Sequence, residues 1–289
     1  MPPSKQTLVV AGLEVNVFSD SSSKDASVPV AVCFLLHGRL SSTSAVEKVA
    51  QSLIQLTREG PNNVRQLQRS LLVVTFDQRN HGTRLMSAQA NDGWSKGSEN
   101  NDRHAIDMYS IQTGTARDVS FLIDFLPSYL YPSSERVIST WGVAGISLGG
   151  HAAWISLSAE PRIKFGIPII GCPDFVKLMS ARAGKYSKPF APPFVPDSLM
   201  VYIRQHDPSN LPYHTSNVSN PFIDKKILVL SGGIDTLVPW TASQAFVERL
   251  EVGQGGVKKV VVVPDAGHEC TAAMVAEAAQ FLETEILTI

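Results

Sequence analysis

The chain has 289 residues, of which 44% are hydrophobic and 18% are charged, and its formal net charge at pH 7 is −1. This length and composition predict one large domain with a substantial buried core and exclude a globally disordered chain. The near-zero charge, without a basic stripe or polybasic cluster, argues against nucleic acid and anionic membranes as partners. No apolar stretch approaches the length of a membrane span, and the polar first residues do not read as a secretory signal, so we expect a soluble, cytoplasmic protein.

The first third of the chain predicts strands alternating with helices. Two short strands should turn near Gly12, and the continuously apolar runs at residues 30–36 and 71–76 read as strands buried on both faces. A capping box at residues 44–47 opens a helix that runs to about residue 58. A longer helix is expected from about residue 105 to residue 126.

The most informative segment is Gly-Ile-Ser-Leu-Gly-Gly at residues 145–150, between a β-rich apolar run and a helix-like run. A strand, a tight G-x-S-x-G turn and a helix make a nucleophile elbow. Gly145 and Gly149 remove Cβ atoms that would collide with neighbouring backbone in so sharp a turn. The turn should lift the hydroxyl of Ser147 clear of the sheet. The following helix points its N–H groups at the same place, where they stabilise a developing negative charge.

The rest of the chain continues the alternation, with strands expected at 165–170, 226–230 and 257–263 and helices at about 241–250 and 271–287. This pattern predicts a mostly parallel sheet covered on both faces. Residues 172–221 break the rhythm because they are rich in proline and weakly periodic, yet they carry too many aromatic residues for a free linker. We expect a long irregular insertion that forms a cap or lid. The core would then comprise residues 1–171 and 222–289.

A nucleophilic serine needs a base, and the base needs an acid that orients it. In a parallel sheet these groups should follow the carboxyl ends of strands. Asp235 and His268 follow two of the expected strands, and with Ser147 they give the chain order Ser, Asp, His that is typical of a G-x-S-x-G enzyme. Asp174, after the preceding strand, is the rival acid. The other histidines that could act as the base are His37, His81 and His151.

An oxyanion hole requires backbone N–H donors beside the serine. We expect one from Leu148, directly after Ser147, and one from Arg39, in the loop after the strand at 30–36. We expect His37 to shape this loop. The cysteines, at positions 33, 172 and 270, have none of the paired spacings of a zinc site, and no metal is expected.

Taken together, the chain resembles the α/β-hydrolase superfamily over nearly its whole length, and small intracellular esterases and thioesterases look most similar. The motifs that carry the resemblance are H-G at 37–38, D-x-R-N-H-G at 77–82, G-x-S-x-G-G at 145–150, G-x-x-D at 232–235 and G-H at 267–268. The resemblance implies the α/β-hydrolase fold: a mostly parallel eight-stranded sheet with helices on both faces, and a cap insertion after the sixth strand. It also implies a serine acyl-enzyme and no metal or organic cofactor.

The chain departs from some members in one place: the H-G loop continues with Arg39 and Leu40 instead of further glycines, which disfavours the long-chain lipase type. Asp77 and Arg79 should brace loops near the site. The expected reaction is hydrolysis of a carboxylic ester or thioester with a hydrophobic portion, either a free small molecule or one held by a carrier protein. The alternatives are a prolyl-type peptidase, an acyltransferase or chain-releasing enzyme, and a non-catalytic ligand-binding protein on the same fold.

Overall fold

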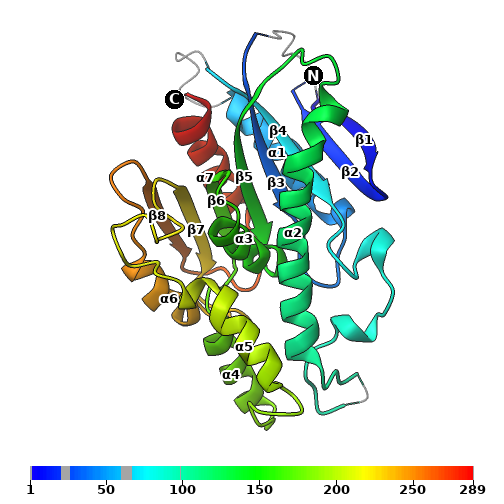
Figure 1. Ribbon diagram of the computed structural model, residues 1–289, viewed down its shortest axis with the longest axis vertical. Helices are drawn as coiled ribbons and strands as arrows, with labels where there is room; N and C mark the ends of the chain where they lie inside the picture. The colour runs from blue at the N-terminus through cyan, green and yellow to red at the C-terminus, as the bar shows by residue number, and fades with distance from the viewer. Residues whose placement is uncertain (1, 21–26, 60–66, 98, 289) are drawn as a thin grey trace.

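An eight-stranded β-sheet forms the centre of the molecule (Figure 1). The computed structural model describes residues 2–20, 27–59, 67–97 and 99–288. In the sheet the strands follow the order β1-β2-β4-β3-β5-β6-β7-β8. The strands are β1 (Ser4–Val10), β2 (Leu13–Ser19), β3 (Val30–Leu36), β4 (Ser70–Phe76), β5 (Ile138–Ile146), β6 (Ile163–Ile169), β7 (Lys226–Gly232) and β8 (Val257–Val263).

Only β2 runs against the other strands. It pairs antiparallel with β1 and with β4, whereas the pairs from β4 through β8 are all parallel. The turn between β1 and β2 passes through Gly12, whose φ of 83° lies in the left-handed region that glycine adopts without strain. The predicted hairpin near Gly12 and the mostly parallel eight-stranded sheet are therefore confirmed.

Helices cover both faces of the sheet. On one face, Val119, Trp154 and Phe246 from three different helices share one hydrophobic core with the strands; on the other, Leu53 and Met274 share a second core. The three helices of the first face are α2 (His104–Leu130), α3 (Leu148–Ala159) and α6 (Trp240–Arg249). The helices of the second face are α1 (Thr43–Glu59) and α7 (Ala272–Phe281). A π-helical turn at Leu282–Leu287 extends α7. Apolar side chains on both faces explain why the central strands read as continuous apolar runs.

Strand β3 shows this two-sided burial most directly. Val32 and Phe34 belong to the first core, whereas Cys33 and Leu35 belong to the second, because successive side chains of a strand point to opposite faces. All seven residues of β3 are buried. A polar substitution anywhere in this strand would therefore leave an unsatisfied group in one of the two cores.

The segment between β6 and β7 differs from the sequence prediction. Residues 172–221 were expected to be irregular, but they contain helices α4 (Phe175–Lys185) and α5 (Asp197–His206) and a short 3₁₀ turn at Pro208–Asn210. Helix α4 begins because the Asp174 carboxylate accepts a hydrogen bond from the Lys177 N–H, and it is held in place because Phe175 packs on Tyr109 with ring centroids 4.6 Å apart. In Figure 1, α4 and α5 lie beyond the lower end of the sheet.

The division into a core and a separate cap stays a prediction. Of the described helices, none combines the length and the apolar character that a membrane span requires. The three cysteines are unpaired: Cys33 and Cys172 are buried, and Cys270 is partly buried.

Candidate active site

The turn between β5 and α3 holds Ser147 in a strained backbone conformation. Its φ is 55° and its ψ is −110°, a region that residues with a side chain rarely adopt. A Cβ atom added at Gly145 would overlap the carbonyl group of Gly149, and one added at Gly149 would overlap the carbonyl group of Leu36. Both positions therefore require glycine, for the steric reason that the motif predicts.

Ser147, His268 and Asp235 come together at the carboxyl ends of three parallel strands. Ser147 Oγ lies 2.7 Å from His268 Nε2, and His268 Nδ1 lies 2.7 Å from Asp235 Oδ2. The serine follows β5, the aspartate follows β7 and the histidine follows β8. Because these strands are parallel, the loops that follow them meet at one edge of the sheet.

Asp235 is held as a buried carboxylate. Its side chain is 0% exposed, and its Oδ1 accepts hydrogen bonds from the N–H groups of Leu237 (2.8 Å) and Val238 (2.9 Å). Burial by itself raises the pKa of this carboxyl, but the hydrogen bonds from His268, Val238 and Leu237 outweigh it and hold the pKa below its ordinary value. An ionised Asp235 accepts a hydrogen bond from the N–H of His268 Nδ1, so Nε2 is the ring nitrogen that presents a lone pair to the Ser147 hydroxyl.

Asp174, the alternative candidate for the acid, caps a helix instead of hydrogen-bonding to His268. Asp174 Oδ1 accepts a hydrogen bond of 2.9 Å from the Lys177 N–H, so this side chain caps α4. It has no hydrogen bond to His268 among the described residues.

The other histidines considered as bases have different partners. In His37, Nδ1 donates to the Gly38 carbonyl at 2.7 Å and Nε2 accepts from the Gln78 N–H at 3.0 Å. His151 Nδ1 lies 2.8 Å from the Cys172 nitrogen, and His81 Nδ1 lies 2.9 Å from the Arg79 carbonyl oxygen. Burial, the largest effect in each case, lowers the pKa of all three rings, to about 4 for His37 and His151.

The loop after β3 lies beside the nucleophile. A Cβ atom placed on Gly38 would lie 3.8 Å from Ser147 Cβ, and the Gly149 N–H donates to the His37 carbonyl at 3.1 Å. Leu148 is the first residue of α3, where backbone N–H groups have no partner within the helix. The two residues expected to form the oxyanion hole, Leu148 and Arg39, therefore belong to segments that flank Ser147, and their role stays a prediction.

Asp77 and Arg79 each connect separate segments near this loop. Asp77 Oδ1 accepts a hydrogen bond of 2.8 Å from the Thr43 N–H at the start of α1, and Oδ2 accepts hydrogen bonds from the N–H and hydroxyl of Thr83. Arg79 forms two hydrogen bonds to Asp118 of α2. This is the bracing expected of the D-x-R-N-H-G segment.

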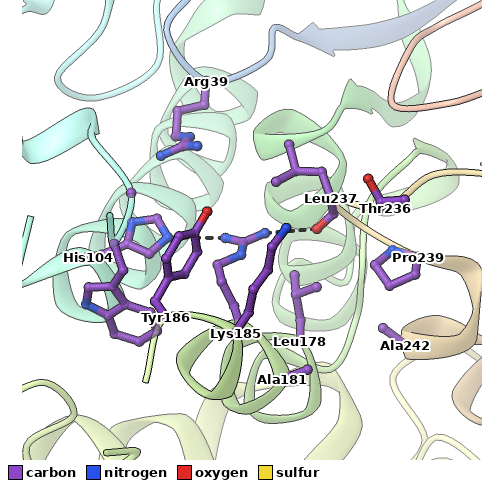
Figure 2. A pocket seen from close by; sticks show the side chains of 13 residues that line it. Arg39, His104, Leu178, Ala181, Lys185, Tyr186, Thr236, Leu237, Pro239 and Ala242 are labelled. Carbon is purple, nitrogen blue, oxygen red and sulfur yellow. Dashed lines mark hydrogen bonds between the residues drawn. The ribbon is translucent and has the colours of Figure 1, made fainter. Parts of the chain in front are cut away.

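A cavity of about 160 Å³ lies between the loop after β3, the loop after β7 and helix α4 (Figure 2). Arg39 enters it from the first loop and Leu237 from the second. Its lining residues are Arg39, Gly93, Trp94, His104, Leu178, Ala181, Arg182, Lys185, Tyr186, Thr236, Leu237, Pro239 and Ala242. The cavity is thus bounded by the same two loops that flank Ser147 and carry Asp235.

Most of these lining residues were not anticipated from the sequence. Arg182 and Lys185 stand three positions apart, which places them on one face of a helix, but the segment was not predicted to be helical. Trp94 and His104 come from a polar loop and a helix start that carry no recognisable motif. Among the described residues no cluster of His, Cys, Asp and Glu side chains could hold a metal ion.

The strand order, the covered faces and the nucleophile elbow define the chain's architecture as the α/β-hydrolase fold. Solved structures show the same fold over nearly the whole chain. TT1662 from Thermus thermophilus superposes with a TM-score of 0.65 at 18% sequence identity, covering 98% of each chain.

Two further solved structures have names that state an activity. Acetyl xylan esterase 1 from Thermoanaerobacterium sp. has a TM-score of 0.55 at 18% identity, over 97% of this chain and 82% of that one. An acylaminoacyl peptidase from Pyrococcus horikoshii has a TM-score of 0.57 at 12% identity, over 100% of this chain and 42% of that one. Identities this low show the fold alone. No protein-family model and no curated protein matches the sequence.

Proposed function

We propose that the chain is a serine hydrolase that cleaves a carboxylic ester or thioester through an acyl-enzyme. The observation that carries this proposal is the pair of hydrogen bonds, each 2.7 Å long, that links Ser147 to His268 and His268 to Asp235. This is the arrangement of nucleophile, base and orienting acid that acyl transfer requires. The fold shared with an esterase and a peptidase is consistent with the proposal.

In the first half of the reaction, Ser147 Oγ attacks the carbonyl carbon while its proton passes to His268 Nε2. Asp235 stabilises the imidazolium that forms. The negative charge on the carbonyl oxygen of the tetrahedral intermediate is held by the N–H groups of Leu148 and Arg39. When the intermediate collapses, the bond to the leaving oxygen or sulfur breaks, and His268 returns the proton to the leaving group.

In the second half, a water molecule attacks the acyl-enzyme. His268 Nε2 takes a proton from this water as it adds to the acyl carbon, which regenerates a tetrahedral intermediate in the same oxyanion site. The bond from the acyl carbon to Ser147 Oγ then breaks, and the proton passes from His268 to that oxygen. The products are a carboxylic acid and the free enzyme.

The substrate portion next to the reacting carbonyl should be hydrophobic. Trp94, Leu178 and Leu237 present apolar surface to the cavity beside the site. Of the aromatic residues in the 172–221 segment, Tyr186 lines this cavity, whereas Phe175 packs on Tyr109 of α2. An apolar acyl chain or leaving group would fill the space that these side chains enclose.

The proposal is tested with 4-nitrophenyl esters of increasing acyl length and with a fluorophosphonate probe. We expect wild type to hydrolyse the esters and to carry the probe on Ser147, whereas Ser147→Ala does neither. Ser158→Ala, which changes another serine of helix α3, serves as the matched control and should behave as wild type. Equal activity in wild type and Ser147→Ala would refute the proposal, and so would a failure of the probe to label wild type.

Matched leaving groups separate the alternative activities. One acyl chain is offered as an oxygen ester, a thioester and a 4-nitroanilide, and prolyl amides are tested beside them. Preference for prolyl amides would indicate a peptidase. Transfer of the acyl group to an added alcohol or amine in preference to water would indicate an acyltransferase.

A further inference from the structure

Three cationic side chains line the cavity beside the proposed nucleophile. Arg39 enters from the loop after β3, while Arg182 and Lys185 come from helix α4. Figure 2 shows the Arg39 side chain and the Tyr186 hydroxyl directed toward each other across the cavity. The cavity therefore combines apolar walls with a concentration of positive charge.

No carboxylate in the described part of the chain lies within ion-pair distance of these cations. Within the described residues none of the three forms an ion pair, although Asp92 acts electrostatically on Arg39 and Asp235 acts on Arg182. Arg39 donates one hydrogen bond, to the Asn91 carbonyl at 2.8 Å. Arg182 donates to the Leu237 carbonyl at 3.1 Å and to His104 Nε2 at 3.2 Å. A guanidinium has five N–H donors, so both groups keep donors for a ligand.

Burial opposes the positive charge of both guanidinium groups more than the neighbouring acidic groups favour it. Burial is the largest effect on Arg182 and, with repulsion from Arg39, lowers its pKa to about 10. Burial likewise lowers the pKa of Arg39 below its ordinary value. Two half-buried guanidinium groups that repel each other destabilise the folded chain, and a bound anion would remove that destabilisation.

The position of the cluster relates it to the reaction. Arg39 follows Gly38, and a Cβ atom placed on Gly38 would lie 3.8 Å from Ser147 Cβ. Arg182 donates a hydrogen bond to the Leu237 carbonyl, and the Leu237 N–H donates one to Asp235. Both guanidinium groups thus belong to segments in contact with the triad, and we infer that one substrate molecule spans from a carbonyl at Ser147 to a group bound between them. A planar oxyanion such as a carboxylate matches the fork of N–H donors on arginine.

We propose that this cavity binds a carboxylate of the substrate, so that the preferred substrates are esters with a negatively charged group on the acyl or the leaving side. The inference rests on the proposed function and narrows its substrate class. The apolar walls hold the hydrocarbon part of the substrate, and Arg39, Arg182 and Lys185 hold its charged end.

Paired substrates test the charge preference. On the acyl side, 4-nitrophenyl hydrogen adipate is compared with 4-nitrophenyl heptanoate. On the leaving side, a phenyl hexanoate with a carboxylate on the ring is compared with the same ester without it. We expect kcat/KM to favour the charged member of one pair by about 10- to 100-fold, because hydrogen bonds to charged groups are of that strength. The preference should shrink as salt screens the charges.

Variants assign the preference to the cluster. Arg182→Gln should remove most of it, Lys185→Gln should reduce it, and Arg182→Lys should restore part of it. Lys185 is exposed and forms no hydrogen bond within the described residues, so Lys185→Gln should not disturb folding. The matched control is Arg204→Gln on α5, an exposed arginine outside the cavity, which should keep the wild-type preference.

A binding measurement separates this inference from the proposed function. By calorimetry, Ser147→Ala should bind monomethyl adipate more tightly than dimethyl adipate, and adding Arg182→Gln should abolish the difference. Ser147-dependent hydrolysis without charge preference in either pair, and without this binding difference, would overturn the inference and leave the proposed function intact. A binding difference that depends on Arg182, without Ser147-dependent hydrolysis, would support the cavity and refute the proposed function.

Discussion

His268 Nδ1 lies 2.7 Å from Asp235 Oδ2, although the two residues are 33 positions apart and follow different strands. The carboxylate is anchored from its other side by two backbone N–H groups of its own loop. The orientation of the His268 imidazole thus depends on the Asp235 carboxylate, whose position is fixed by hydrogen bonds from the backbone. This relationship determines which ring nitrogen of His268 carries the proton.

Asp235→Asn should lower kcat on the order of 10⁴-fold, because an amide can donate to His268 Nδ1 and so favours the wrong tautomer. Steady-state hydrolysis of a 4-nitrophenyl ester measures the effect. Asp174→Asn is the matched control: asparagine caps a helix as well as aspartate does, so kcat should stay within a few-fold of wild type. The reverse pattern, with Asp174→Asn inactive and Asp235→Asn active, would contradict the assignment.

Gly149→Ala should destabilise the fold by about 1–3 kcal/mol or more, because the added Cβ overlaps the Leu36 carbonyl and the backbone must shift. Ser147 would move with it, so activity should fall too. Urea unfolding measures the change in stability. Gly184→Ala is the control, since a Cβ there meets nothing within 4 Å and alanine favours the helix by up to about 1 kcal/mol. Equal stabilities of the two variants would argue against a sterically required glycine.

His37→Leu should reduce kcat with little change in KM. The substitution leaves the Gly38 carbonyl and the Gln78 N–H without their partner, and each buried unpaired group costs about 1–3 kcal/mol. The loop that carries the Arg39 N–H would relax, and losing one oxyanion donor lowers kcat by about 10² to 10³. His214→Leu, at an exposed position, should behave as wild type. An unchanged kcat in His37→Leu would show that this loop does not depend on the ring.

Asp207 should make the fold more stable as the pH falls from about 7 toward 4. Burial is the main cause that raises the pKa of this carboxyl from 3.8 to about 7. The native state therefore binds a proton at a pH where the unfolded chain has released it, so this contribution is complete below the unfolded pKa and is lost as the pH rises through about 7.

Urea unfolding of wild type and Asp207→Asn across this pH range checks the point. The variant has no carboxyl to ionise, so the stability difference between the two proteins should change by about 1–3 kcal/mol between pH 4.5 and pH 8, with the variant gaining relative to wild type at the higher pH. A pH-independent difference would show that Asp207 does not titrate in this range.

The sequence predicts best the features that depend on local signals. The strands around Cys33 and Leu228 read as apolar runs because both their faces are covered, and the elbow is recognisable because Gly145 and Gly149 are sterically required. The loop positions of Asp235 and His268 follow from where strands end. Because the strands before these loops are parallel to the strand before Ser147, all three residues lie at the same edge of the sheet.

The sequence predicts least well what depends on tertiary contact. Helices α4 and α5 are short and lie among prolines, and α4 is held by contacts such as Phe175 against Tyr109, which no local pattern encodes. The cavity is formed by Arg39, Trp94 and Arg182 from three separate segments. Such a cluster becomes visible only when the fold has brought those segments together.

The place of β8 at the edge of the sheet has a consequence for refolding. This strand pairs with β7 alone, and the loop that follows it carries His268. A chain that has assembled the sheet only as far as β7 would already expose the serine hydroxyl but would lack the imidazole to activate it. We therefore expect catalysis to recover more slowly than β-sheet circular dichroism after dilution from denaturant. The delay between the two signals would measure how long β8 takes to dock onto β7.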